Sequence, residues 1–183
     1  QVSKVSFHIP QSCLFTYDGT AKEPTDITVI LNDKTLTKDV DYTVSYSDNV
    51  NAGTATVIVT GKGNYKDTSV GVFTIYKKEI GISWDATEFM PYTGEILVLQ
   101  ATATGLVDGD NCTLTTSVVE TSEGAGIIPG TWTAKVTALS NNNYKLPESG
   151  ERVTATYSII KASQNEPLSV STVDETIDGK ADG

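Results

Sequence analysis

The sequence repeats itself, and this internal repeat constrains the fold more than any other feature. Four short segments of the first half recur in the same order in the second half. The matched pairs are FTYDG at 15–19 with MPYTG at 90–94, AGTATVIVT at 52–60 with PGTWTAKVT at 129–137, GNY at 63–65 with NNY at 142–144, and FTI at 73–75 with YSI at 157–159. Because the order is kept, the chain is predicted to fold as two related modules in tandem.

The repeat also sets the expected boundaries. We expect a first module over residues 1–77, a second and more divergent copy over 78–162, and an acidic linker or the start of a further module over 163–183. The spacing between matched segments grows along the chain, which predicts insertions in the second copy around residues 119–128. The chain begins without Met or a signal-peptide pattern, so we expect it to be part of a longer precursor.

Both copies show the two-residue period of half-buried strands. Tyr42, Val44 and Tyr46 alternate with polar residues, and a similar alternation runs through residues 55–60. Turn-forming residues such as Asp18 and Gly19 separate these runs. The predicted fold is therefore all-β: two tandem small antiparallel modules of about five or six strands each, with an Ig-like sandwich favoured over a β-grasp-like single sheet.

Composition excludes several classes of protein. With 38% hydrophobic and 20% charged residues, the chain has enough apolar side chains to build a core. The net charge of −10, from 23 acidic and 13 basic residues, argues against a nucleic-acid partner, whose phosphates need clustered Lys and Arg. The apolar runs are far shorter than a membrane-spanning helix, so we expect no membrane span.

The spaced blocks of the repeat resemble a known family. In the first copy they are FTYDGTAKEP at 15–24, DYTVSY at 41–46, NAGTA at 51–55 and GKGNY at 61–65; in the second they are YTG at 92–94, ATGLVDGD at 103–110 and NYKLP at 143–147. They are similar to the Ig-like repeat modules, often described as YDG- and MBG-type, of cell-surface proteins from Gram-positive gut bacteria (Firmicutes). The resemblance implies an extracellular location at the bacterial cell surface or cell wall, a stalk or adhesin role, and no catalytic residues.

Candidate chemistry is sparse. His8 is the single histidine and lies in a predicted strand, so no hydrolytic triad is expected and the chain is predicted not to be an enzyme. The acidic run from Asp108 to Asn111 lacks the spacing of a calcium loop and is predicted to be a plain turn. We expect no metal and no cofactor. Cys13 and Cys112 are not expected to pair, and each is predicted to be a small buried hydrophobe.

Exposed aromatic rings are the remaining candidates for ligand binding. Trp132 shares a face with apolar residues of its strand, and Trp84 follows other apolar residues in step two, so both are predicted to point into their cores. Tyr17 and Tyr92 lie at matching positions beside a turn and are the better candidates for exposure and for tentative ligand contact. Their recurrence in both copies equally suits a structural anchor.

The sequence thus predicts a non-catalytic structural or adhesive segment of a secreted surface protein, acting as a stalk, a spacer or a protein-interaction surface. The alternatives are a carbohydrate-binding module and an accessory domain of a larger secreted enzyme. We expect a monomer, and its partner, if there is one, to be a host or extracellular glycan or protein.

Overall fold

The structure of the chain is a computed structural model that describes residues 6–8, 14–85, 89–148 and 153–161. Its elements are fifteen strands, and no helix is among them, so the all-β prediction is confirmed for these residues. The predicted tail over 163–183 and Cys13 lie outside the described residues. In the described part of the chain, no helix is long and apolar enough to cross a membrane.

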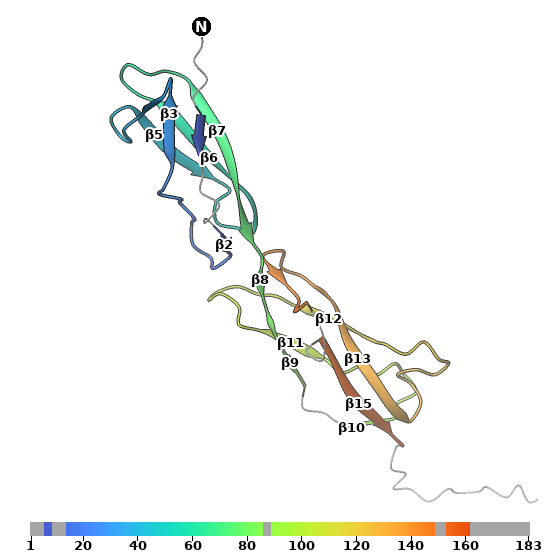
Figure 1. Ribbon diagram of the computed structural model, residues 1–183. Coiled ribbons are helices and arrows are strands. Elements are labelled where there is room, and N and C mark those ends of the chain that lie inside the picture. The colour runs from blue at the N-terminus through green and yellow to red at the C-terminus, as the bar shows by residue number, and fades with distance from the viewer. Residues whose placement is uncertain (1–5, 9–13, 86–88, 149–152, 162–183) are drawn as a thin grey trace, which may run out of the picture.

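Strands before Lys77 build two sheets (Figure 1). One has the order β2-β7-β6-β5 and the other the order β1-β3-β4. Their bounds are β1 Ser6–His8, β2 Phe15–Thr16, β3 Thr28–Leu31, β4 Lys34–Thr35, β5 Tyr42–Ser47, β6 Gly53–Gly61 and β7 Thr68–Tyr76. We call this part of the chain the N-terminal half.

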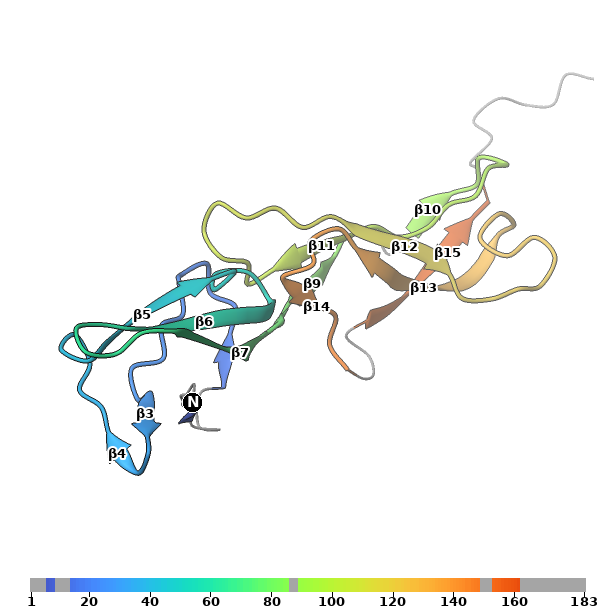
Figure 2. The same cartoon turned by 90° about the horizontal axis from the view of Figure 1, so that it is seen from above.

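Strands after Lys77 build a similar set, which we call the C-terminal half. A four-stranded sheet has the order β10-β15-β13-β12, and two smaller sheets pair β11 with β9 and β14 with β8. Their bounds are β8 Lys78–Glu79, β9 Gly81–Trp84, β10 Phe89–Pro91, β11 Ala101–Thr104, β12 Leu114–Val118, β13 Gly130–Leu139, β14 Tyr144–Lys145 and β15 Thr154–Ile160. Among the described strands, each sheet draws on one half alone, and the halves lie end to end along an elongated molecule (Figures 1 and 2).

The internal repeat holds at the level of strand register. Ile75 of β7 pairs with Phe15 of β2 on one side and with Gly53 of β6 on the other. The matching residue of the second copy, Ile159, has the equivalent partners in β10 and β13, which are Met90 and Gly130. The segments that match in sequence therefore occupy matching places in the two sheets.

The insertion predicted in the second copy is also present. The connection between β12 and β13 covers residues 119–129, whereas the connection between β5 and β6 covers residues 48–52. The second copy is also longer between β13 and β15, residues 140–153, than the first is between β6 and β7, residues 62–67. The extra residues leave the order of the main strands unchanged.

The prediction of antiparallel modules is confirmed for most strand pairs. It is wrong for three of them, because β2 runs parallel to β7, β10 to β15 and β8 to β14. The strand count also exceeds the expected five or six per copy. The short strands β4, β8 and β14 have two residues each, which is too few to show any period in the sequence.

The alternation read from the sequence places the core correctly. Ala55, Val57 and Val59 of β6 are buried, and Trp132 and Ala134 of β13 are buried in the same way. Each half has its own cluster of buried side chains around these residues. A further cluster draws on both halves, and it defines the region described next.

Candidate functional site

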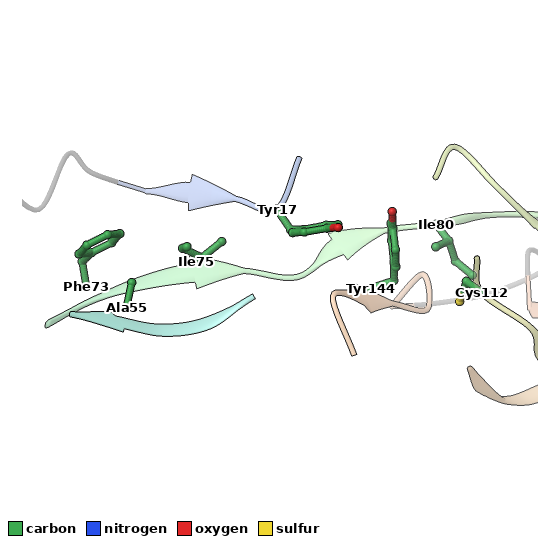
Figure 3. Close-up of a cluster of buried hydrophobic side chains, with 7 residues drawn as sticks. All are labelled: Tyr17, Ala55, Phe73, Ile75, Ile80, Cys112 and Tyr144. Carbon is green, nitrogen blue, oxygen red and sulfur yellow. The ribbon is translucent and has the colours of Figure 1, made fainter. Parts of the chain in front are cut away.

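The two halves contact each other through packed side chains and hydrogen bonds that lie outside their separate cores. This contact lies where β7 ends at Tyr76 and the chain passes through Lys77 into β8. A single hydrophobic cluster spans it, with Tyr17, Ala55, Phe73 and Ile75 from the N-terminal half and Ile80, Cys112 and Tyr144 from the C-terminal half (Figure 3). We call the polar and apolar contacts around this cluster the joint.

Tyr17 and Tyr144 meet at the centre of the joint. Their ring centroids are 5.5 Å apart and the planes cross at 85°, an edge-to-face arrangement that Figure 3 shows. Both hydroxyls donate to Oδ2 of Asp110, at 2.8 Å from Tyr17 and 2.5 Å from Tyr144. The Tyr144 hydroxyl also accepts a hydrogen bond from the Val107 amide at 2.8 Å. One carboxylate therefore ties a residue near the start of the N-terminal half to two segments of the C-terminal half.

Local turns position these groups. The Tyr17 amide donates to the Tyr76 carbonyl at 2.9 Å, which holds Tyr17 beside the last residue of β7. After it, Asp18 accepts hydrogen bonds from the amide and hydroxyl of Thr20 and forms an ion pair with Lys22. These bonds close a turn in which Gly19 has a φ of 80°, a conformation that favours glycine.

Asp110 is presented by a turn of the C-terminal half. Its amide donates to the Val107 carbonyl at 3.0 Å, and Gly109 within the turn has a φ of 86°. The same turn places Val107 over Gly19, where a Cβ built on the glycine would lie 2.8 Å from the Val107 side chain. The close approach of the two turns thus depends on glycine at position 19.

A second set of hydrogen bonds flanks the tyrosines. Oδ1 of Asn143 accepts from the Ala52 amide at 2.9 Å, and its Nδ2 donates to Oδ1 of Asn51 at 3.0 Å. The Asn143 carbonyl accepts from the Lys78 amide at 2.9 Å, within the pairing of β8 and β14. Asn143 therefore contacts the N-terminal half with its side chain and the connecting strand with its backbone.

The protonation states of Asp110, Tyr17 and Tyr144 at the joint do not change near neutral pH. Hydrogen bonds from Tyr144 and then Tyr17 lower the pKa of Asp110. The hydrogen bond to Asp110 raises the pKa of Tyr17, and burial followed by the hydrogen bond to Asp110 raises the pKa of Tyr144 to about 12. Near neutral pH the carboxylate stays ionised and both phenols stay protonated, which is the opposite of a catalytic pair with pKa values near 7.

The two tyrosines proposed as ligand contacts have different surroundings. The expectation that Tyr17 is exposed is wrong: the C-terminal half covers it and leaves 5% of its surface accessible. Tyr92 is exposed as predicted, at 41%. The two residues do not come together, and the role of either as a ligand contact stays a prediction.

The predictions for the tryptophans and the thiol agree with the described structure. Trp132 is buried and its Nε1 donates to the Ile128 carbonyl at 3.0 Å. Trp84 packs against the same cluster, and its buried Nε1 has no hydrogen-bond partner among the described residues. Cys112 is a buried free thiol in the joint cluster. The backbone of His8 lies in β1, while its side chain lies outside what the structure describes.

Sequence reasoning missed Asp110, Val107 and Asn143 as joint residues. Asp110 lies in a predicted turn and, with Val107, in the segment ATGLVDGD at 103–110, but neither feature indicates a contact with the other half. Asn143 and Tyr144 belong to a repeated segment, which marks them as structurally important without indicating what they contact. In the described part of the chain, no cluster of three or more His, Cys, Asp or Glu side chains could hold a metal ion.

One hollow of about 330 Å³ lies next to the joint, in the loop of residues 48–54. Its lining comes from that single loop, and two of the lining residues, Asn51 and Ala52, already contact Asn143. The hollow is therefore part of the edge of the joint.

Comparisons of the chain with protein-family models, with curated proteins and with solved structures found no match.

Proposed function

We propose that the chain is a non-catalytic structural segment of a secreted bacterial cell-surface protein, and that it acts as a stalk or spacer. The observation that carries this proposal is the joint, where a shared apolar cluster and hydrogen bonds to Asp110 and Asn143 connect two modules placed end to end. Two modules linked only by a flexible chain would need none of these contacts. A spacer that holds a distal domain at a fixed distance needs them.

Each half is proposed to be a small Ig-like sandwich. In the N-terminal half, the cluster around Val57 also contains Val29 of β3, so strands of two different sheets share one core. This shared core is expected of two packed sheets and is not expected of the single-sheet alternative. The repeated pairing of a short early strand with the last strand supports the same fold for both halves.

The chemistry of the joint supports a structural role. A general acid or base works best with a pKa near the working pH. At the joint, hydrogen bonds from the two tyrosines lower the pKa of Asp110, the bond to Asp110 raises the pKa of Tyr17, and burial followed by the bond to Asp110 raises the pKa of Tyr144. These groups are suited to holding two surfaces together.

Small-angle X-ray scattering of the chain tests the spacer function. We expect a narrow distribution of maximum dimensions in the unmodified chain and a broader one in Asp110→Ala. Asp108→Ala is the matched control, because Asp108 is an exposed residue of the same turn. A broad distribution in the unmodified chain, or no difference between the two variants, would contradict a rigid spacer.

A carbohydrate-binding module is the second candidate, and one observation favours it. Phe89 and Tyr92, both near the end of the C-terminal half, are 60% and 41% exposed, and exposed rings of this kind can stack on sugars. Binding of the chain to an array of glycans and host matrix proteins tests it, with Tyr92→Ala and Tyr17→Ala alongside. Specific binding that is lost in Tyr92→Ala and kept in Tyr17→Ala would replace the spacer by a lectin-like role.

A further inference from the structure

Three exposed apolar side chains lie at the far end of the C-terminal half. Tyr92, Ile128 and Ile160 are 41%, 47% and 46% exposed. They lie at the same end of the sheet. The Tyr92 amide donates to the Ile160 carbonyl at 2.8 Å, and Ile128 lies two residues before Gly130 of β13, which pairs with Ile159 of β15. We call these three residues the end patch.

At Tyr92 the end patch matches the surface that the N-terminal half presents at the joint, whereas Ile160 matches Tyr76, which stays exposed there. Tyr92 corresponds to Tyr17, and both amides donate to the last residue of the final strand of their sheet. The turns that follow also match: the Glu95 amide donates to Oγ1 of Thr93 as the Thr20 amide donates to Asp18, and Gly94 has a φ of 84°. The difference is coverage, since Tyr17 is buried by a neighbouring module and Tyr92 has no such module among the described residues.

We propose that the end patch is a docking surface for a further β module of the same kind, one that presents a carboxylate and an aliphatic loop residue as the C-terminal half presents Asp110 and Val107. The inference rests on the proposed spacer function and extends it, because it makes the joint a contact that can be repeated along a series of modules. The Tyr92 hydroxyl would donate to the incoming carboxylate as Tyr17 does.

Within the described part of the chain, no atom of a distant segment approaches Gly94 as Val107 approaches Gly19. Over Gly19 the joint is filled by Val107, which a Cβ on the glycine would approach to 2.8 Å. At Gly94 the nearest atom to a built Cβ is the Tyr92 hydroxyl, at 3.8 Å. An aliphatic side chain can pack over Gly94, in the place that Val107 takes over Gly19, with the Tyr92 hydroxyl turned away from the glycine and toward the incoming carboxylate.

Two hydrogen bonds of the joint, both made by the Asn143 side chain, cannot be repeated at the end patch. Pro129 stands where the N-terminal half has Ala52, and proline has no amide hydrogen to donate to a residue such as Asn143. Ile128 stands where that half has Asn51, so apolar contact replaces the second hydrogen bond. The end patch is thus a more apolar version of the joint surface.

The free end of the N-terminal half is a poorer partner than a copy of the C-terminal half. Its counterpart of Tyr144 is Tyr65, whose hydroxyl accepts a hydrogen bond from Nζ of Lys34 at 3.1 Å. The ammonium group of a protonated lysine is only a donor, so it cannot accept a hydrogen bond from the Tyr92 hydroxyl. This comparison favours a module of the C-terminal kind over head-to-tail pairing of two chains.

Insertion of a second copy of residues 78–161 directly after Lys161, with the remainder of the chain kept, tests the proposal. Lys161 follows Ile160 as Lys77 follows Tyr76, so the insertion recreates the connection found at the natural joint. Fluorine NMR of the fluorotyrosine-labelled protein, with a soluble paramagnetic reagent, reports the accessibility of each ring. In the unmodified chain Tyr92 should be as accessible to the reagent as Tyr76, which is exposed. In the protein with the insertion, Tyr92 of the original copy should be as protected as Tyr17, which is buried.

The controls are made in the inserted copy. Asp110→Ala there should make the original Tyr92 accessible again, whereas Asp108→Ala should leave it protected. A second insertion, preceded by a short Gly-Ser linker, covers the case in which the direct connection prevents folding. If Tyr92 stays as accessible as Tyr76 in the folded insertions, the proposal is overturned, whatever scattering shows for the natural joint.

Discussion

Tyr144 combines complete burial with a polar hydroxyl that has two partners. The hydroxyl donates to Asp110 and accepts from the Val107 amide, while the ring packs against Tyr17. Loss of the hydroxyl would leave the Val107 amide and one position on the carboxylate without their partner, and unsatisfied polar groups in a packed region lower stability. The energetics of the joint are therefore expected to depend strongly on this residue.

Tyr144→Phe keeps the ring and removes the hydroxyl, so it measures the hydrogen bonds alone. We expect the free energy of unfolding to fall by about 1 kcal/mol, the usual net contribution of a buried hydrogen bond. Urea denaturation measures it. Tyr76→Phe is the control, because Tyr76 is exposed and its change should be close to zero. Equal effects of the two substitutions would contradict a special role for the Tyr144 hydroxyl.

The lowered pKa of Asp110 predicts how the free energy of unfolding changes in acid. Its pKa lies below the ordinary value of 3.8 in the folded chain, because Tyr144 and Tyr17 donate to it. A carboxyl with a lowered pKa stabilises the fold above its unfolded pKa, and this contribution is lost as the pH falls through the folded pKa. The difference in unfolding free energy between the unmodified chain and Asp110→Asn should therefore narrow as the pH falls below 3.8.

Denaturation of both proteins at a series of pH values measures this difference. Other carboxyls with lowered pKa, such as Asp18, are present in both chains and cancel in the comparison. A difference that stays constant from neutral to acid pH would show that the tyrosines do not hold the ionised form of Asp110.

Among the elements, the turn after β2 and its counterpart after β10 form a matched pair for mutation. Gly19 and Gly94 have nearly the same positive φ, so alanine at either position should cost about 1–2 kcal/mol in backbone strain. Gly19→Ala has an additional cost, since its Cβ would approach Val107 across the joint. Thermal or urea unfolding should therefore show a larger loss of stability for Gly19→Ala than for Gly94→Ala. Equal losses would mean that the turn at Gly19 is not in close contact with the turn that carries Val107.

The elements also show what the sequence could and could not predict. The long strands were predictable because alternation over five or more residues, as in β5 and β6, shows directly which face is buried. The matched segments predicted equivalent places for residues such as Tyr17 and Tyr92. The burial of Tyr17 was not predictable, because it depends on Asp110 and Tyr144 of the other half, and no local pattern records which turn of one module meets another.

For the whole molecule, the shared cluster predicts that the halves unfold together. Calorimetry of the unmodified chain should show one transition, because unfolding of either half exposes the apolar surface of the other at the joint. Asp110→Ala combined with Asn143→Ala should separate this into two transitions. The control is Asp108→Ala with Asn142→Ala, two exposed neighbours. Two transitions in the unmodified chain, or one in the joint variant, would contradict coupling through the joint.

The parallel pairs β2 with β7 and β10 with β15 have a mechanical consequence. In each pair an early strand lies beside the final strand and runs in the same direction. Tension that is passed on through the strands before it, β1 in one half and β8 and β9 in the other, therefore acts along the pair in shear. Hydrogen bonds under shear share the force and must break together, whereas bonds at an opening edge break one after another. Under flow or traction, each half should therefore resist extension until its pair ruptures as a unit, and the rate of that rupture sets how long the chain withstands the pull.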